Sequence, residues 1–336
     1  MGTLAPDRIL HELSDLWVSQ GKEGHAESGA GVLRACSMTL VVVSEADDDA
    51  AALGEILAAL MPEHPARTIL IRLSGAGPAA LEDRVYAQCW MPFGQRRQIC
   101  CEQVEITASD AALADVPPVV LPLAVADLPL ILWCRSPRMV AMKEFEALAA
   151  MAHKVVLDSA GATDERAALV RLGQRTGGGW ILGDLAWTRL TRWREMISHL
   201  FENREILSSL DKVSQVTVEY PGASPTACSL YMGAWVTECL TAAGVTPRLT
   251  LAPGEWKGGG EAPLILRVVL EGDGIFVEIL RWKDRMVTTV NNLAQCAHLP
   301  ILTEYALVRE ELGIVRRDPV FEKALASAAR LAYSNQ

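Results

Sequence analysis

Short apolar runs alternate with amphipathic segments in the first half of the chain, and this pattern predicts strands alternating with helices. Residues 38–43 (MTLVVV) and 67–73 (RTILIRL) are largely apolar runs of the kind found in strands buried on both faces. Between them, residues 50–61 have helical periodicity, and the aspartates at 47–49 supply an N-cap and an acidic first turn. A strand, a helix and a strand in this order predict a βαβ unit with parallel strands and a right-handed crossover.

Further segments extend this pattern to residue 157. Residues 84–90 and 98–107 predict two strands, and their short connection makes them an antiparallel hairpin. LPLILWC at 128–134 and KVVL at 154–157 predict two more buried strands, with a helix at 144–151 between them. The segments predicted ahead of this sheet are an amphipathic helix at 9–19 and a polar, glycine-rich loop at 21–31.

The first half therefore has the pattern of an α/β domain with a mixed, mostly parallel sheet and helices on both faces. The second half has an α+β pattern with an antiparallel meander, in which EGDG at 271–274 predicts a hairpin turn. Glycines at 177–179 form the predicted joint, which gives domains 1–175 and 180–336. The helices predicted around and beyond the joint are 162–176, 185–201, 226–243, 304–312 and 319–332. The strands predicted there are 213–219, 248–251, 264–270, 275–282 and 286–290.

Composition narrows the class of protein. A chain of 336 residues is too long for one ordinary core, and 50% apolar against 21% charged residues excludes an intrinsically disordered protein. The formal net charge of −10 opposes a nucleic-acid binder, which needs a basic stripe to replace counterions. The start lacks the pattern of a secretory signal, and prolines interrupt the apolar stretch 112–134. We therefore expect a cytoplasmic protein that binds neither nucleic acid nor a membrane.

The cysteines and histidines do not form a recognisable metal-binding or redox motif. None of the eight cysteines forms Cys-x-x-Cys, so we expect reduced, structural thiols. Glu195, His199 and Glu202 are spaced for one helical face and could form half of a metal site. Without a second histidine nearby, a solvated helix face is the favoured interpretation, and no metal site is predicted.

The strongest candidate for a nucleotide site is the sequence from Gly75 to Ala80 (GAGPAA), a G-x-G-x-x-A match directly after an apolar strand. Such a motif must open a helix, whereas residues 81–90 become strand-like within a few positions. An ordinary turn is favoured, and a sugar-phosphate or nucleotide-binding sensor or enzyme using the Gly75–Gly77 turn stays as the alternative. Asp158 and Ser159 follow a strand, where α/β active sites lie, but an aspartate there is also a common helix N-cap. We therefore predict no catalytic residue and no cofactor.

Tryptophan and arginine gather in the helical segment 182–205, and both residue types are enriched at interface hot spots. One face of this helix could fill the interior while its arginine edge meets a partner. The competing interpretation is a core helix whose arginines snorkel to solvent. The residues concerned are Trp187, Arg189, Arg192, Trp193 and Arg194.

Several blocks of the sequence resemble one family. They include TLVVV at 39–43, HPART at 64–68, ICCEQVE at 99–105 and, most specifically, LGDLAWTRLTRWRE at 182–195. With LPLILW at 128–133 and VVLDS at 155–159, they resemble the glucose-6-phosphate dehydrogenase assembly proteins (OpcA). The resemblance implies a non-catalytic protein of carbohydrate metabolism that binds glucose-6-phosphate dehydrogenase, the first enzyme of the oxidative pentose phosphate pathway. It would assist assembly of that enzyme or activate it allosterically.

The resemblance supplies no contact residues, so we infer them from the chain. We expect Trp187, Arg189, Arg192, Trp193 and Arg194 to contribute anchors for the dehydrogenase. Arg135 and Arg138, which follow the LPLILWC strand, would form a secondary patch or, in a sugar-phosphate sensor, a phosphate site.

Overall fold

The computed structural model describes residues 4–27, 32–90, 98–175, 178–260, 262–300 and 302–334. The chain divides into two compact units. The first comprises Met1–Leu157 and Gly179–Gly183, and the second comprises Asp158–Gly178 and Asp184–Gln336. The predicted domains 1–175 and 180–336 assign the segment 158–178 differently, and they stay a prediction.

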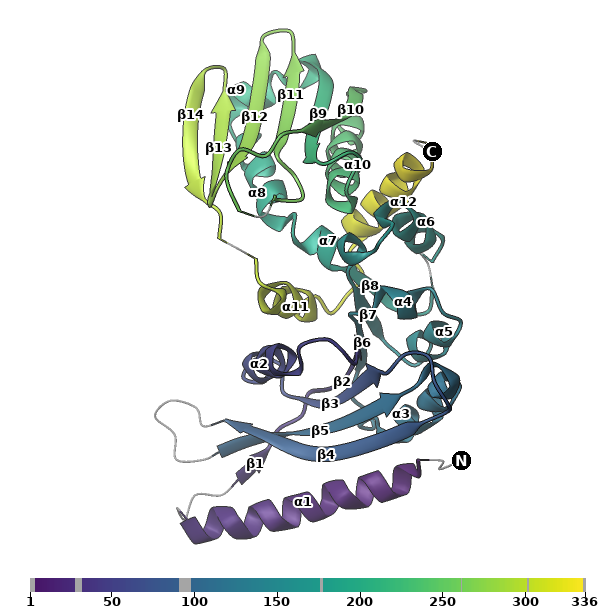
Figure 1. The fold of residues 1–336 in the computed structure, drawn as a ribbon. Coiled ribbons are helices and arrows are strands. Elements are labelled where there is room, and N and C mark those ends of the chain that lie inside the picture. Colours follow the sequence, from purple (N-terminus) through teal and green to yellow (C-terminus); the bar gives the residue numbers. More distant parts are fainter. Residues whose placement is uncertain are drawn as a thin grey trace. The chain divides into compact units, whose positions relative to one another are not determined.

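The first unit is built on a mostly parallel sheet (Figure 1). The strand order is β1-β5-β3-β2-β6-β7-β8, and β4 pairs antiparallel with β5 as the predicted hairpin. This confirms the predicted mixed, mostly parallel sheet. The strands are β1 Val32–Arg34, β2 Met38–Glu45, β3 Ala66–Leu73, β4 Leu81–Trp90, β5 Gln98–Ala108, β6 Leu130–Cys134, β7 Lys154–Leu157 and β8 Ile181–Asp184.

Helices cover both faces of this sheet, which explains why β2 and β3 are buried along almost their whole length. Because the chain moves one way from β2 to β3 and the other way from β5 through β6 to β7, right-handed crossovers put α2 on one face and α3 and α5 on the opposite face (Figure 1). The helices are α1 Pro6–Glu27, α2 Ala50–Leu60, η1 Asp110–Asp115, α3 Val116–Leu123, α4 Pro137–Val140 and α5 Glu144–Ala149.

In the first unit, helix α1 is longer than predicted and helix α3 was not predicted. Helix α1 continues to Glu27, through the first part of the predicted loop 21–31, and the rest of that loop lies outside the described residues. Glycine in a helix costs only about 1 kcal/mol, and the lysine, glutamate and alanine around it favour the helix. In α3, Pro117 and Pro118 occupy the first turn, where backbone N–H groups have no partner inside the helix. These prolines therefore start a short helix.

The expectation that all cysteines are thiols is wrong for one pair. Cys89 and Cys100 form a disulfide, because the β4–β5 register places them directly opposite each other. Because the two cysteines are 11 positions apart in the sequence, they do not form a Cys-x-x-Cys motif. Their pairing depends on the register of the two strands, which a sequence motif could not show. The cysteines described as free are Cys36, Cys101, Cys134, Cys228, Cys239 and Cys296.

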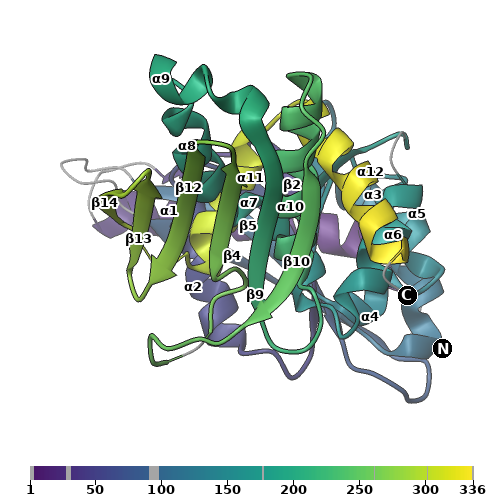
Figure 2. The same ribbon diagram turned by 90° about the horizontal axis from the view of Figure 1, so that it is seen from above.

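The second unit contains a six-stranded sheet of order β10-β9-β11-β12-β13-β14 (Figure 2). From β9 through β11 to β14 all neighbours are antiparallel, which confirms the predicted α+β fold with a meander. Strand β10 instead pairs parallel with β9, because helix α10 connects the two as a crossover. The strands are β9 Val213–Pro221, β10 Arg248–Gly254, β11 Arg267–Gly272, β12 Ile275–Trp282, β13 Arg285–Val290 and β14 Leu293–His298.

The helical side of the second unit packs around an aromatic cluster. The rings of Trp187, Tyr231 and Phe321 have centroids 5.7 to 6.1 Å apart. The predicted helix 185–201 is divided at Arg189 and Leu190 into α7 and α8. The helices of this unit are η2 Ser159–Gly161, α6 Glu165–Gln174, α7 Leu185–Thr188, α8 Thr191–Leu200, α9 Arg204–Leu207, η3 Leu210–Lys212, α10 Ala227–Ala242, α11 Glu304–Gly313 and α12 Pro319–Ser334.

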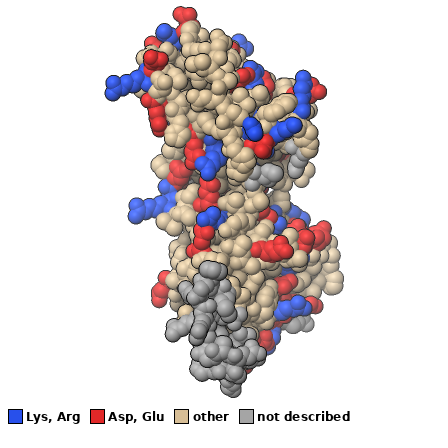
Figure 3. Space-filling model, turned by 90° about the vertical axis from the view of Figure 1, so that its left-hand side faces the viewer, with Lys and Arg blue, Asp and Glu red and all other residues tan. Residues whose placement is uncertain are grey.

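Two observations bear on the expectation that the chain binds neither a membrane nor nucleic acid. Among the described residues, no helix is long and apolar enough to cross a membrane. On the face drawn in Figure 3, basic and acidic side chains lie among one another and do not form a single basic field.

Candidate functional sites

The carboxyl edge of the parallel sheet is the first candidate site. The order β5-β3-β2-β6-β7-β8 reverses direction between β2 and β6, and in doubly wound folds ligands bind outside the strand ends at that point. Glu45 ends β2, while Ser136 and Arg138 follow β6. The sheet therefore brings these three residues together at the position where an α/β protein would bind a ligand.

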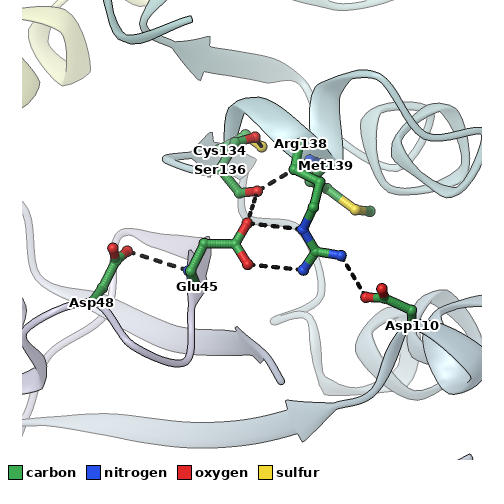
Figure 4. A network of polar contacts seen from close by, with 7 residues as sticks. All are labelled: Glu45, Asp48, Asp110, Cys134, Ser136, Arg138 and Met139. Carbon is green, nitrogen blue, oxygen red and sulfur yellow. Dashed lines mark hydrogen bonds and ion pairs between the residues drawn. The ribbon is translucent and has the colours of Figure 1, made fainter. Parts of the chain in front are cut away.

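An ion-pair network fills this position (Figure 4). Arg138 donates from Nη2 to Glu45 Oε2 at 2.8 Å and from Nε to Oε1 at 3.3 Å, and its Nη1 reaches Asp110 Oδ1 at 2.5 Å. Ser136 donates its hydroxyl to Glu45 and accepts from the backbone N–H of Met139 at 3.1 Å. The hydrogen bonds from Arg138 to the two carboxylates raise the pKa of its guanidinium.

A dinucleotide does not fit the residues at this edge. The turn after β2 holds three aspartates in place of a glycine-rich loop, and their charges would repel a pyrophosphate. Asp49 accepts from the backbone N–H groups of Ala51 and Ala52 at 2.9 and 3.1 Å, so it occupies the donors at the N-terminus of α2 that would hold a phosphate. The Gly75–Gly77 turn leads into strand β4, so it opens no helix.

The secondary patch predicted from the sequence lies around this network. Arg135 donates from Nη1 to Asp48 Oδ2 at 2.8 Å, and its guanidinium carbon stands 5.7 Å from the ring centroid of Trp133. Arg138 is held by Glu45 and Asp110 as described. Both arginines are thus neutralised by carboxylates within the first unit, and sequence reasoning missed Glu45 and Asp110, the two partners of Arg138.

The tryptophan–arginine segment, in the second unit, is the second candidate. Trp187 and Trp193 are each only 4% exposed, so both rings belong to the interior. Arg194 stacks over Trp187 at 3.5 Å from its centroid, and burial lowers the pKa of Arg194 to about 10. Arg192 points to solvent and pairs with Glu195 at 2.8 Å. The two tryptophans therefore face inward, and of the three arginines Arg192 has the most exposed side chain.

Arg189 connects this segment to two carboxylates, the half-buried Asp158 and the fully buried Asp184. Its two terminal nitrogens donate to the two oxygens of Asp158, each at 2.6 Å, while Asp158 also caps η2. Asp184 is fully buried and accepts from the backbone of Ser159 and Ala186 and from the hydroxyl of Tyr231. Burial, with the nearby charge of Asp158, raises the pKa of Asp184 to about 6.

Asp158 and Asp184 are positioned as helix caps and do not resemble a catalytic arrangement. Each accepts hydrogen bonds from backbone N–H groups at helix starts, which is the role of a cap. The neighbouring Cys228 is buried, and burial raises the pKa of its thiol, which opposes nucleophilic chemistry. The spaced trio Glu195, His199 and Glu202 shows only an exposed contact of 3.1 Å between His199 and Glu202. The described residues contain no cluster suited to a metal ion.

Sequence reasoning missed a third candidate, a cavity of about 710 Å³ within the second unit. It is lined by η2, by the α7–α8 junction and α8, by the start of α10 and by the end of β12. The β10–β11 and β12–β13 connections and the segment after β14 complete the lining. Arg189 and Trp193 contribute to its wall, so the segment 182–205, which the sequence singled out, forms one side of the cavity. The other sides come from loops far away in the sequence.

Comparison with known proteins shows where the chain belongs. Residues 58–174 match a family described as the glucose-6-phosphate dehydrogenase subunit N-terminal domain, and residues 181–325 match the C-terminal domain of the same subunit. An OxPP cycle protein OpcA of Nostoc punctiforme is 28% identical over 142 residues, or 42% of this chain and 30% of that protein. The OpcA of a Synechocystis strain is 24% identical over 180 residues, or 53% of this chain and 37% of that protein.

Solved structures are similar only at a distance. A mutant of KijD10, a 3-ketoreductase from Actinomadura kijaniata, has a TM-score of 0.49 with 13% identity, covering 88% of this chain and 96% of that one. Biliverdin reductase from Synechocystis has a TM-score of 0.47 with 10% identity, covering 88% and 98%. At these values the likeness carries no argument about activity or ligands.

The two family matches together span most of the chain, while the alignments reach only 30% to 40% of the length of the curated relatives. The resemblance seen in the sequence is thereby confirmed. The chain belongs to the OpcA family of glucose-6-phosphate dehydrogenase subunits.

Proposed function

We propose that this chain is a non-catalytic assembly factor or allosteric activator that binds glucose-6-phosphate dehydrogenase in the cytoplasm. It favours the active oligomer of that enzyme or its state of high substrate affinity, and so supports the oxidative pentose phosphate pathway. The observation that carries the proposal is the match of both halves of the chain to domains described as a subunit of this dehydrogenase.

The filled sheet edge supports a non-catalytic role. A dehydrogenase of this topology would need a phosphate-binding turn after β2, and here Asp49 occupies those backbone donors while Glu45 and Arg138 fill the adjoining space. The fold thus keeps the α/β scaffold and uses its ligand position for internal ion pairs.

An activator must bind one state of its client more tightly than another, because equal affinity for both would shift nothing. A tenfold gain in apparent substrate affinity requires a preference of about 1.4 kcal/mol. A few contacts at the edge of a protein interface are enough to supply that difference.

The contact surface proposed here is the solvent-facing edge of α8. Arg192 is the arginine best placed to meet a partner, because its side chain is 60% exposed and it pairs with the exposed Glu195. Arg189 and Arg194 stay in the proposal with less exposed side chains, since Arg189 pairs with Asp158 and Arg194 stacks on Trp187. Trp187 and Trp193 are buried and support the helix from the interior. Arg135 and Arg138 stay in the proposal as the secondary patch.

The test is a titration of the purified dehydrogenase with this chain. We expect co-elution on a sizing column and a lower half-saturation concentration for glucose 6-phosphate. Arg192→Ala should weaken the effect at least tenfold without changing the melting temperature, whereas Arg316→Ala, another exposed arginine of the second unit, should leave it unchanged. Absence of co-elution would exclude the proposal, and full activation by Arg192→Ala would exclude this helix edge.

A further inference from the structure

The cavity of the second unit has a size and a lining that suit a small ligand. Its volume of about 710 Å³ lies within the range of about 300 to 1,000 Å³ that small-molecule sites occupy. All the residues that line it belong to the second unit, so its shape is set within one compact part of the chain. Two tryptophans, three cations and two carboxylates are among them: Trp193, Trp256, Arg189, Arg281, Lys283, Asp158 and Asp284.

Arg281 is the residue in this wall that most needs an explanation. Its side chain is half-buried at the end of β12, and Nε donates to the backbone oxygen of Lys283 at 3.2 Å. In the described part of the chain it forms no ion pair, and burial lowers the pKa of its guanidinium. A cation taken out of water without a counter-charge costs free energy, so an anion in the cavity would be stabilised there.

Lys283 adds a second cation at the rim of the same cavity. It occupies the tight turn between β12 and β13 with φ of 55°, a left-handed conformation that glycine or asparagine normally supplies. A lysine here costs about 1 kcal/mol relative to glycine. Glycine would suit this turn better than lysine. A function of the lysine side chain, such as binding an anion in the cavity, would explain why lysine occupies the position.

Trp256 contributes an apolar surface to the cavity, and contacts within its own loop restrain its ring. Its indole Nε1 donates to the backbone oxygen of Gly259 at 3.1 Å, and its ring lies so close to Gly258 that a Cβ there would stand 2.2 Å from a ring carbon. These contacts restrain the half-buried ring, which belongs to the cavity lining. Trp193 supplies further aromatic surface from α8. Aromatic faces of this kind pack against the C–H face of a sugar ring.

We propose that this cavity binds a phosphorylated monosaccharide, with the phosphate on Arg281 and Lys283 and the sugar ring along Trp256. The paired Asp158 and Arg189 line the same space and offer an acceptor and donors for ring hydroxyls. The lining carries three cations against two carboxylates, which suits one phosphate monoester and opposes a di- or triphosphate. The inference goes beyond the proposed function, because binding by the chain alone requires no dehydrogenase.

The experiment is titration calorimetry on the full chain without any partner. The probes are glucose 6-phosphate, glucose, inorganic phosphate and NADP+. We expect saturable binding of glucose 6-phosphate, with glucose and phosphate each at least tenfold weaker because each uses only part of the site. Absence of saturable binding of glucose 6-phosphate at millimolar concentrations, or tighter binding of NADP+, would overturn the proposal. Binding of the chain to the dehydrogenase is measured in the separate titration described above, so failure of the sugar-phosphate proposal and failure of the proposed function can be distinguished.

Two variants locate the site, and a third is the control. Arg281→Ala and Lys283→Gly should each weaken binding of glucose 6-phosphate about tenfold or more. Lys283→Gly should fold at least as well as the parent, because glycine relieves the left-handed turn. Arg248→Ala removes an exposed arginine of the same unit outside the cavity lining and should leave the affinity unchanged. If both cavity variants bind like the parent, the ligand lies elsewhere and the proposal is wrong.

Discussion

At the scale of single residues, Asp184 ties stability to pH. It is fully buried, and its pKa is raised from 3.8 to about 6. Between these values the folded state holds a proton that the unfolded state has released, so the stabilisation is complete below the unfolded pKa and is lost as pH rises through the folded one. Asp184→Asn removes the ionisation, so relative to the parent it should gain up to about 3 kcal/mol between pH 4 and pH 7.

Urea unfolding at the two pH values measures this difference. The exposed Asp211→Asn serves as the control and should show no such pH-dependent gain. Absence of a pH-dependent gain in Asp184→Asn would mean that the buried carboxyl does not titrate in this range.

The turn between β11 and β12 gives a second prediction at this scale. An added Cβ at Gly272 would lie 1.7 Å from the backbone oxygen of Lys212, whereas Gly274 has open space around it and φ of 73°. Gly272→Ala should therefore destabilise the fold by roughly 2 to 4 kcal/mol, because backbone must move. Gly274→Ala should cost only about 1 kcal/mol for the left-handed conformation. Thermal unfolding of both variants compares them, and equal losses would contradict the close approach to Lys212.

At the scale of elements, sequence pattern predicted the buried strands well. MTLVVV, RTILIRL and KVVL became β2, β3 and β7, because continuous apolar runs of this length have few other places in an α/β fold. Strand β14 was missed because LAQCAH is mostly exposed and lacks an apolar pattern. The β9–β10 pairing was missed as well, since parallel register depends on where α10 packs. Local patterns specify elements, and long-range contacts specify their partners.

The β2 end and the start of α4 form one electrostatic element that a double-mutant cycle can measure. Arg138→Ala and Glu45→Ala should each destabilise the protein, and the double variant should lose less than the sum. Their side chains are 35% and 27% exposed, so solvent screens the pair and we expect a coupling of about 1 kcal/mol.

The matched comparison is the exposed pair Arg192 and Glu195, for which a coupling of about 0.3 kcal/mol is expected. Chemical denaturation of each set of variants gives both numbers. Additive losses for Arg138 and Glu45 would show that the network at the sheet edge contributes contacts without mutual stabilisation.

At the scale of the whole molecule, the candidate sites were harder to predict than the fold. Trp187 and Arg192 give the same signal in sequence, yet one lies 4% exposed in the core and the other faces solvent. Burial is decided by tertiary packing, so residue type alone could not separate them. The cavity is built from six separate stretches of chain, and no local motif connects Trp256 with Arg281 or Asp158.

The path of the chain between the two units yields the last prediction. The segment Asp158–Gly178 belongs to the second unit, where Arg166 Nη2 donates to Ala332 O at 3.0 Å and Asp158 pairs with Arg189. A fragment 180–336, cut at the predicted domain boundary, loses α6 and uncovers the buried side of α12. It also leaves Arg189, whose side chain is 26% exposed, without its carboxylate, and removing one partner of a largely buried ion pair destabilises a fold.

A fragment 158–336 keeps these contacts, so it should melt cooperatively and well above fragment 180–336. Circular dichroism at 222 nm and limited proteolysis compare the two directly. Equal, cooperative melting of both fragments would show that the second unit folds without α6. In that case the boundary of the folding domain would lie at the glycines 177–179, as predicted from the sequence. The segment 158–178 would then pack against a domain that folds without it.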